Sequence, residues 1–122
     1  MFYIVLLREL AARNQLLEAQ PYPVEQALKR LGQNLRTARL RRNLTIQEVA
    51  EKIGTGPRAV RDAENGKAST GIAVSAALLW LYDLLQPFED VADPLKDEQG
   101  LVLASMKERV RARKSGGLDN DF

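Results

Sequence analysis

The sequence contains neither cysteine nor histidine. Without cysteine there is no disulfide, no thiolate nucleophile and no thiolate-bound zinc. Without histidine the chain lacks the commonest general base and the commonest ligand of catalytic zinc. Most catalytic classes are therefore excluded, and we expect a protein that is not an enzyme and that holds no metal or cofactor.

Long apolar runs are also missing. The longest strongly apolar stretch, residues 72–85, is shorter than a membrane span and is interrupted by polar side chains. The apolar start, residues 1–7, has no basic residue before it and is followed at once by Arg8 and Glu9, which is not typical of a signal peptide. We therefore expect no membrane partner and a cytoplasmic location.

The charge that is present is unevenly placed. The chain has 122 residues, 45% of them hydrophobic, which suffices for one domain with a real core. Its net charge is only +2, but residues 25–67 carry ten basic and five acidic side chains, and residues 68–106 carry one basic and six acidic. This separation indicates one surface for a polyanion and a second surface of another kind.

Apolar residues recur at helical spacing along most of the chain, and no strand is strongly indicated. Residues 1–20 favour a helix weakly, with a short strand over residues 2–5 as the alternative, and the Pro21-Tyr22-Pro23 segment is expected to break the chain. Ser69 or Thr70 is expected to cap the fifth helix. The sequence thus predicts an all-α fold, with further helices at residues 24–42, 45–53, 56–64, 70–85 and 97–114.

Two of these helices are short and are joined by a tight turn. Thr45 with Glu48 forms a capping box at the start of the first, and Gly54 permits the sharp turn that follows it. A small residue at Ala50 lets the two helices cross closely, and Val60 packs the second against the first. This is the physical logic of helix-turn-helix DNA binding, in which the second helix enters a major groove.

The segment from about Leu31 to Leu85 resembles the lambda-repressor-like, Xre-family helix-turn-helix domain. Within that family it is most similar to HipB-type antitoxins, through residues 31–39, residues 63–67 and the end of the chain, residues 116–122. The resemblance implies a helix-turn-helix bundle with extra N- and C-terminal helical segments. It also implies a structural ion pair between Arg39 and Glu64.

On this interpretation the chain has four parts. Residues 1–23 are an N-terminal appendage, helical or poorly ordered, and residues 24–86 are the Xre-type DNA-binding domain. Residues 87–114 are a linker and a C-terminal helix, and residues 115–122 are a flexible tail.

The predicted DNA contacts centre on Arg58 and Arg61, three residues apart on the second short helix. The family pattern commonly has Gln where this chain has Ile46, and its second helix commonly begins with small polar residues. These departures shift the expected base reading toward the two arginines, since arginine donates two hydrogen bonds to guanine. The other predicted DNA-binding residues, expected to hold phosphates and set the register, are Gly56, Pro57, Thr45, Gln47, Arg42 and Lys67.

The resemblance also implies a homodimer on a palindromic operator in double-stranded DNA. The fifth helix is apolar nearly all round, and it supplies the candidate interface, formed by Trp80, Leu81, Tyr82 and Leu85. The alternative is a plain core helix that covers the N-terminal appendage, with helix 97–114 forming the dimer instead.

In the tail, Leu118 and Phe122 are apolar residues among acidic ones, a pattern that can fold onto a partner. The resemblance implies that this partner is a HipA-like toxin kinase. The leading interpretation is therefore a transcriptional repressor that acts as the antitoxin of a HipA-type operon. The alternatives are a stand-alone or phage-type repressor without a toxin, and a protein-interaction module that does not bind DNA.

Overall fold

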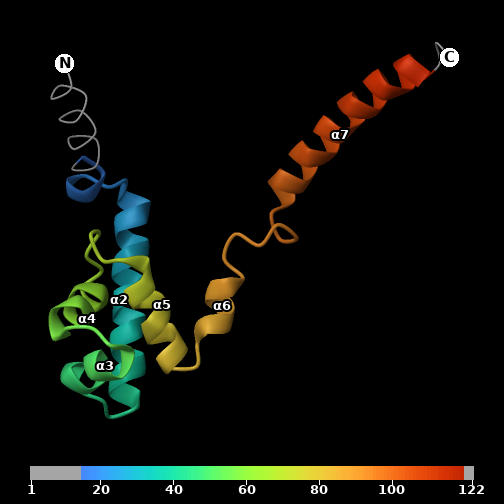
Figure 1. Ribbon diagram of the computed structural model, residues 1–122. Coiled ribbons are helices and arrows are strands. Elements are labelled where there is room, and N and C mark those ends of the chain that lie inside the picture. The colour runs from blue at the N-terminus through green and yellow to red at the C-terminus, as the bar shows by residue number, and fades with distance from the viewer. Residues whose placement is uncertain (1–14, 120–122) are drawn as a thin grey trace, which may run out of the picture. The chain divides into compact units, whose positions relative to one another are not determined.

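The computed structural model describes residues 15–119 of the chain. All regular structure in this range is helical, which confirms the predicted all-α class (Figure 1). A short helical segment covers residues 15–18. The labelled helices are α2 (Tyr22–Arg41), α3 (Ile46–Ile53), α4 (Pro57–Glu64), α5 (Ile72–Leu81), α6 (Leu85–Glu89) and α7 (Glu98–Asp119).

The chain divides into two compact units at Leu85 and Gln86. The first unit contains α2 to α5, and the second contains α7 and the segment that precedes it. Among residues 15–119, no helix combines the length and the apolar composition needed to cross a membrane.

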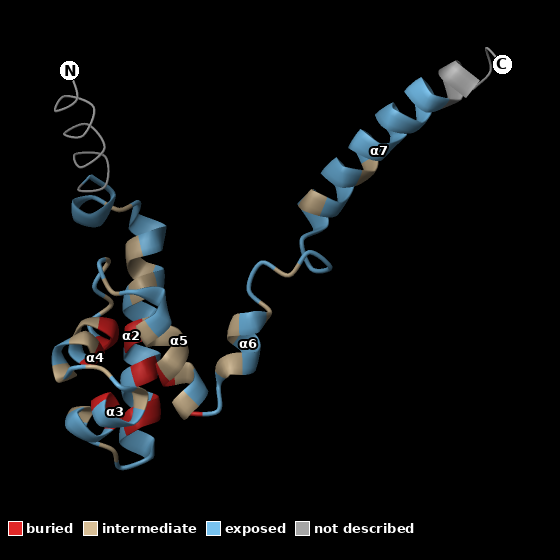
Figure 2. Ribbon diagram, viewed as in Figure 1, coloured by how far each residue is buried: buried red, intermediate tan, exposed pale blue. Residues whose placement is uncertain are grey.

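The core lies where α2, α3, α4 and α5 meet (Figure 2). Each of these four helices contributes at least one buried side chain. Burial of a large aliphatic side chain contributes about 1.5–3 kcal/mol to stability. The largest fully buried side chains are Tyr82, Leu35, Leu78, Val49 and Val60, and alanines 38, 50 and 63 fill the spaces between them.

The ends of α2, α3 and α4 are each followed by a residue in the left-handed conformation, and the sequence analysis predicts the one at Gly54. After α2, Asn43 adopts a positive φ of 54°, and Gly54 ends α3 in the left-handed conformation with a φ of 78°. Gly66, after α4, also has a positive φ, of 68°. These are residues for which left-handed backbone is accessible, so the turns form with little strain.

Other helix bounds differ from the prediction. α5 begins after Gly71 rather than after Ser69 or Thr70, and it ends at Leu81 because Asp83 turns the chain with a φ of 59°. Proline is tolerated in the first turn of a helix, because the N–H groups there have no partner within the helix. α2 therefore begins at Tyr22 with Pro23 in its first turn, and α6 likewise contains Pro87. The predicted break at residues 21–23 is therefore the start of a helix.

The last helix is also longer than predicted. α7 runs through the Ser115-Gly116-Gly117 segment, where the sequence predicts that the helix ends, and continues to Asp119.

Two glycines allow α2 and the end of α4 to approach each other backbone to backbone. A Cβ atom on Gly32 of α2 would collide with the carbonyl oxygen of Glu64 and lie 2.7 Å from that of Ala63. In return, a Cβ atom on Gly66 would lie 2.7 Å from the carbonyl oxygen of Leu28 in α2. A side chain at either glycine would push the end of α4 away from α2.

Gly32→Ala is expected to lower the free energy of unfolding by about 3 kcal/mol, because the new methyl group meets backbone atoms that cannot rotate away. Urea denaturation followed by circular dichroism measures the change. Gly71→Ala is the matched control, because a Cβ atom there meets nothing within 4 Å, and its effect should stay within about 1 kcal/mol. Equal stability of the two variants would contradict the close approach of α2 and α4.

Candidate nucleic-acid interface

The start of α3 is fixed by a reciprocal cap. The Thr45 hydroxyl accepts a hydrogen bond from the Glu48 N–H at 3.1 Å, and the Glu48 carboxylate accepts one from the Thr45 N–H at 3.2 Å. This is the capping box that the sequence predicts. Because its hydroxyl and N–H are both engaged, Thr45 holds the N-terminus of α3 in one conformation.

The turn between α3 and α4 is short, and its own residues fix its backbone conformation. Gly54 takes the left-handed conformation, and the Thr55 N–H donates to the Ala50 carbonyl at 2.9 Å. Gly56 then occupies the N-cap of α4, and Pro57 is its first residue. Ala50 and Val60 are both buried, so the two helices pack closely where they cross.

Helix α4 has one buried side and one exposed side. Val60, Ala63 and Glu64 are buried against the rest of the unit, whereas Arg58 and Arg61 are exposed. The two arginines are three residues apart, so their side chains leave neighbouring points on the same side of the helix. α4 therefore presents two adjacent guanidinium groups to solvent.

The acidic neighbour of these arginines is paired with a lysine. The Asp62 carboxylate lies 3.8 Å from the Lys67 ammonium group, and the Lys67 N–H donates to the Asp62 carbonyl at 3.0 Å. The pairing offsets the negative charge beside Arg58 and Arg61, and it engages one of the predicted phosphate-binding residues.

A buried ion pair joins α2 to the last residue of α4. The Arg39 guanidinium donates from Nε to one Glu64 carboxylate oxygen at 2.7 Å and from Nη2 to the other at 3.0 Å. Its Nη1 donates to the Leu44 carbonyl at 2.9 Å. The hydrogen bond from Glu64 raises the pKa of Arg39, against the lowering effect of burial. These are the two residues for which the resemblance implies a structural ion pair.

Arg42, a predicted phosphate ligand, is engaged within the fold. Its guanidinium donates to the Ala38 carbonyl and to the Tyr82 carbonyl, both at 2.9 Å, and lies 5.3 Å from the centre of the Tyr82 ring. Arg42 thus ties the end of α2 to the end of α5. Its predicted contact with DNA stays a prediction, and sequence reasoning missed this structural role.

Of the other predicted DNA-binding residues, Gln47 is exposed at the start of α3, where its amide donates to the Glu51 carboxylate at 3.3 Å. Gly56 is exposed and Pro57 half-buried at the start of α4. In the described part of the chain, no cluster of three or more acidic side chains is placed to hold a metal ion.

The predicted dimer residues separate into two groups. Trp80 is 62% exposed, and Leu81 and Leu85 are half-buried. Tyr82 is only 1% exposed, and burial raises the pKa of its phenol, so its prediction as an interface residue is wrong. Ile72, which the sequence analysis does not single out, is 71% exposed at the start of the same helix.

The predicted partner-binding site in the tail, formed by Leu118 and Phe122, lies only partly within the described residues. Leu118 belongs to the last turn of α7, and Phe122 lies outside the described range.

Comparison with known proteins agrees with this geometry. Residues 35–80 match the family model described as Helix-turn-helix. The match spans less than half of the chain and covers the core of the first unit, including α3, the turn and α4. The helix-turn-helix family is one of DNA-binding domains, not of enzymes. Searches of curated proteins and of solved structures found no match.

Removing one partner of the buried ion pair should be far more costly than breaking an exposed one. Glu64→Gln is expected to lower the free energy of unfolding by about 3–5 kcal/mol, because the Arg39 charge stays buried without its counter-ion. Glu25→Gln, which breaks the exposed Lys29–Glu25 pair, is the control and should cost less than about 1 kcal/mol. Chemical denaturation measures both, and a small effect of Glu64→Gln would contradict the anchoring role.

Proposed function

We propose that this chain is a sequence-specific DNA-binding transcriptional repressor whose helix α4 enters the major groove of double-stranded DNA. The observation that carries the proposal is the two-sided character of α4. Arg58 and Arg61 are exposed on one side, while Val60 and Ala63 fix the other side to the core. A helix held in this way can enter a groove about 12 Å wide without unpacking the domain.

The chemistry of the exposed side fits base recognition. Arginine in the major groove donates two hydrogen bonds to guanine O6 and N7, and a good pair contributes about 1–3 kcal/mol of discrimination against a wrong base. Thr45, Gln47 and Gly56 lie at the N-termini of α3 and α4, where backbone N–H groups and the helix dipole favour phosphate. On this proposal, α4 reads bases and the helix N-termini set the register.

Arg58→Ala and Arg61→Ala should each weaken binding to the preferred duplex by about tenfold to a hundredfold, because each removes a base contact. The preferred duplex is obtained by selection from a random-sequence DNA pool with the wild-type chain, and affinity is then measured by fluorescence anisotropy. Arg36→Ala, which removes an equal charge from an exposed position of α2, should leave the sequence preference intact.

Two outcomes would contradict the repressor proposal. One is wild-type affinity in the Arg58→Ala/Arg61→Ala double variant. The other is an affinity that does not change between low and physiological salt, since bound phosphates must release counterions. Either outcome favours an interaction module that does not bind DNA.

We propose further that the repressor is a homodimer on a palindromic operator and that α5 forms the dimer contact. Ile72 and Trp80 are large apolar side chains that are mostly exposed, and their spacing of eight residues places them on the same side of α5. Exposed apolar side chains grouped on one helix face are typical of a surface that another protein covers. Two copies would then place two α4 helices in successive major grooves.

Trp80→Glu should convert the dimer to a monomer, because the new carboxylate would be buried without a partner at the interface. Sedimentation velocity at several protein concentrations measures the change. Leu95→Glu is the control, since Leu95 is 82% exposed and lies in the second unit. A wild-type chain that stays monomeric at micromolar concentration, or a Trp80→Glu variant that stays dimeric, would rule out this interface.

The finer proposal is that the repressor serves as the antitoxin of a HipA-type kinase operon. Its support is the resemblance of residues 31–39, 63–67 and 116–122 to HipB-type antitoxins. Co-purification of the native chain with the product of a neighbouring reading frame tests it: recovery of a HipA-like kinase supports the antitoxin role. Recovery of the repressor alone favours a stand-alone or phage-type repressor.

A further inference from the structure

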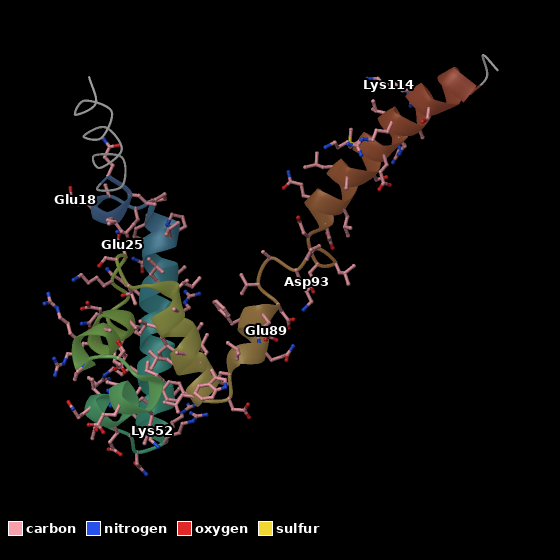
Figure 3. The ribbon with its side chains drawn as sticks, in the orientation of Figure 1. Glu18, Glu25, Lys52, Glu89, Asp93 and Lys114 are labelled. Atoms are coloured by element: carbon pink, nitrogen blue, oxygen red, sulfur yellow. The ribbon has the colours of Figure 1, made fainter. Side chains whose placement is uncertain are left out.

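Helix α7 carries three positive charges in a row along one side. Lys107, Arg111 and Lys114 are separated by four and three residues, so they lie one above another on the helix surface. All three are exposed. We call these residues the basic stripe. Figure 3 shows the last of them, Lys114, in the C-terminal half of α7.

Two further arginines of α7 lie on another side of the helix. Arg109 and Arg113 each follow a stripe residue by two positions, which is about 200° around the helix axis. Arg109 donates to the Ser105 hydroxyl at 3.4 Å. The helix therefore has a face with three aligned cations and a separate face with two.

The helix dipole does not account for the basic stripe. A helix favours cations near its C-terminus, but the effect falls off within the last turn. α7 continues to Asp119, and its last turn contains no basic residue. Lys107 is twelve residues before that end, a distance of about 18 Å along the axis.

Few acidic residues lie near the basic stripe in the sequence. In the described part of the second unit, no ion pair involves Lys107, Arg111 or Lys114. Between residues 107 and 115 there are five basic side chains and only one acidic one, Glu108. Aligned, exposed like charges add nothing to the stability of a helix, so their placement points to an anionic partner.

We propose that the basic stripe is a second DNA contact, which binds phosphates of the same duplex outside the segment read by α4. The proposal rests on the proposed function, because the helix-turn-helix unit is what brings the duplex to α7. DNA carries one negative charge per about 1.7 Å of axis, so a stripe about 10 Å long faces several phosphates. Residues 86–97 tether α7 to the first unit, so the second contact forms at high effective concentration.

Such a contact adds affinity but not sequence preference, since phosphates are the same at every base pair. It also makes a specific prediction about salt. For duplex DNA the logarithm of the binding constant falls against the logarithm of salt concentration with a slope of about 0.9 per neutralised phosphate.

The test compares two double variants of the full chain that remove equal charge from opposite sides of α7. Lys107→Gln/Arg111→Gln removes two stripe residues, and Arg109→Gln/Arg113→Gln is the matched control. Glutamine is nearly as good a helix former as lysine and arginine, and circular dichroism checks that the helix content is kept. Binding to a mixed-sequence duplex of about 40 base pairs, several times the length of one helical turn, is measured at several salt concentrations.

The stripe variant is expected to bind with a salt slope reduced by about 2 and with an unchanged sequence preference, while the control changes the slope by less than about 1. Equal slopes for the two variants would overturn the proposal, because the positive charge would then act only diffusely. A stripe variant with the wild-type slope would also overturn it, and the proposed function would still stand if Arg58→Ala weakens binding. If the wild-type chain binds no duplex, both the inference and the proposed function fail.

The same variants are mixed with vesicles of phosphatidylcholine and phosphatidylserine, because basic helices also bind anionic lipid. One outcome would assign the basic stripe to a membrane surface instead of DNA. In that outcome the wild type binds the vesicles, the stripe variant does not, and the salt slope of DNA binding is the same for both.

Discussion

The bidentate contact between Arg39 and Glu64 fixes the position of α4 on the rest of its unit. A buried carboxylate is stable only with a partner, and the buried carboxylate of Glu64 has Arg39 as its partner. Because Glu64 is the last residue of α4, this contact fixes the C-terminal end of the helix. The glycine pair Gly32 and Gly66 brings the backbones of α2 and the α4 end into contact at the same place. The helix is therefore held at its C-terminal end and by its inner side, and its N-terminal outer side remains available.

Local signals predict the helix-turn-helix unit well. The Thr45–Glu48 cap, the left-handed Gly54 and the Gly56-Pro57 start of α4 are each determined by residues within four positions, so they can be inferred from sequence. The buried residues Val49 and Val60 follow from helical spacing. The pairing of Arg39 with Glu64 spans 25 positions, and only the resemblance to known domains implies it.

The errors occur where tertiary contacts decide the outcome. An apolar helix gives no sign of which side is covered, so the sequence predicts Tyr82 at an interface, whereas Arg42 and the core enclose it. Arg42 is a different case, because its predicted contact with DNA stays a prediction. Its hydrogen bond to the Tyr82 carbonyl is a structural role that becomes visible only in the fold. The sequence predicts that the last helix ends before Gly116 and Gly117, but α7 includes both, because glycine weakens a helix without preventing it.

The anchoring of α4 by its inner side has an evolutionary consequence. The groups that hold the helix include Glu64, Val60, Ala63 and the backbone beside Gly32, and they lie on a different side from Arg58 and Arg61. Exposed positions of this kind change with little cost in stability. On the proposed function, the two outer side chains can therefore diversify to suit other target sequences while the anchoring groups beneath them stay the same.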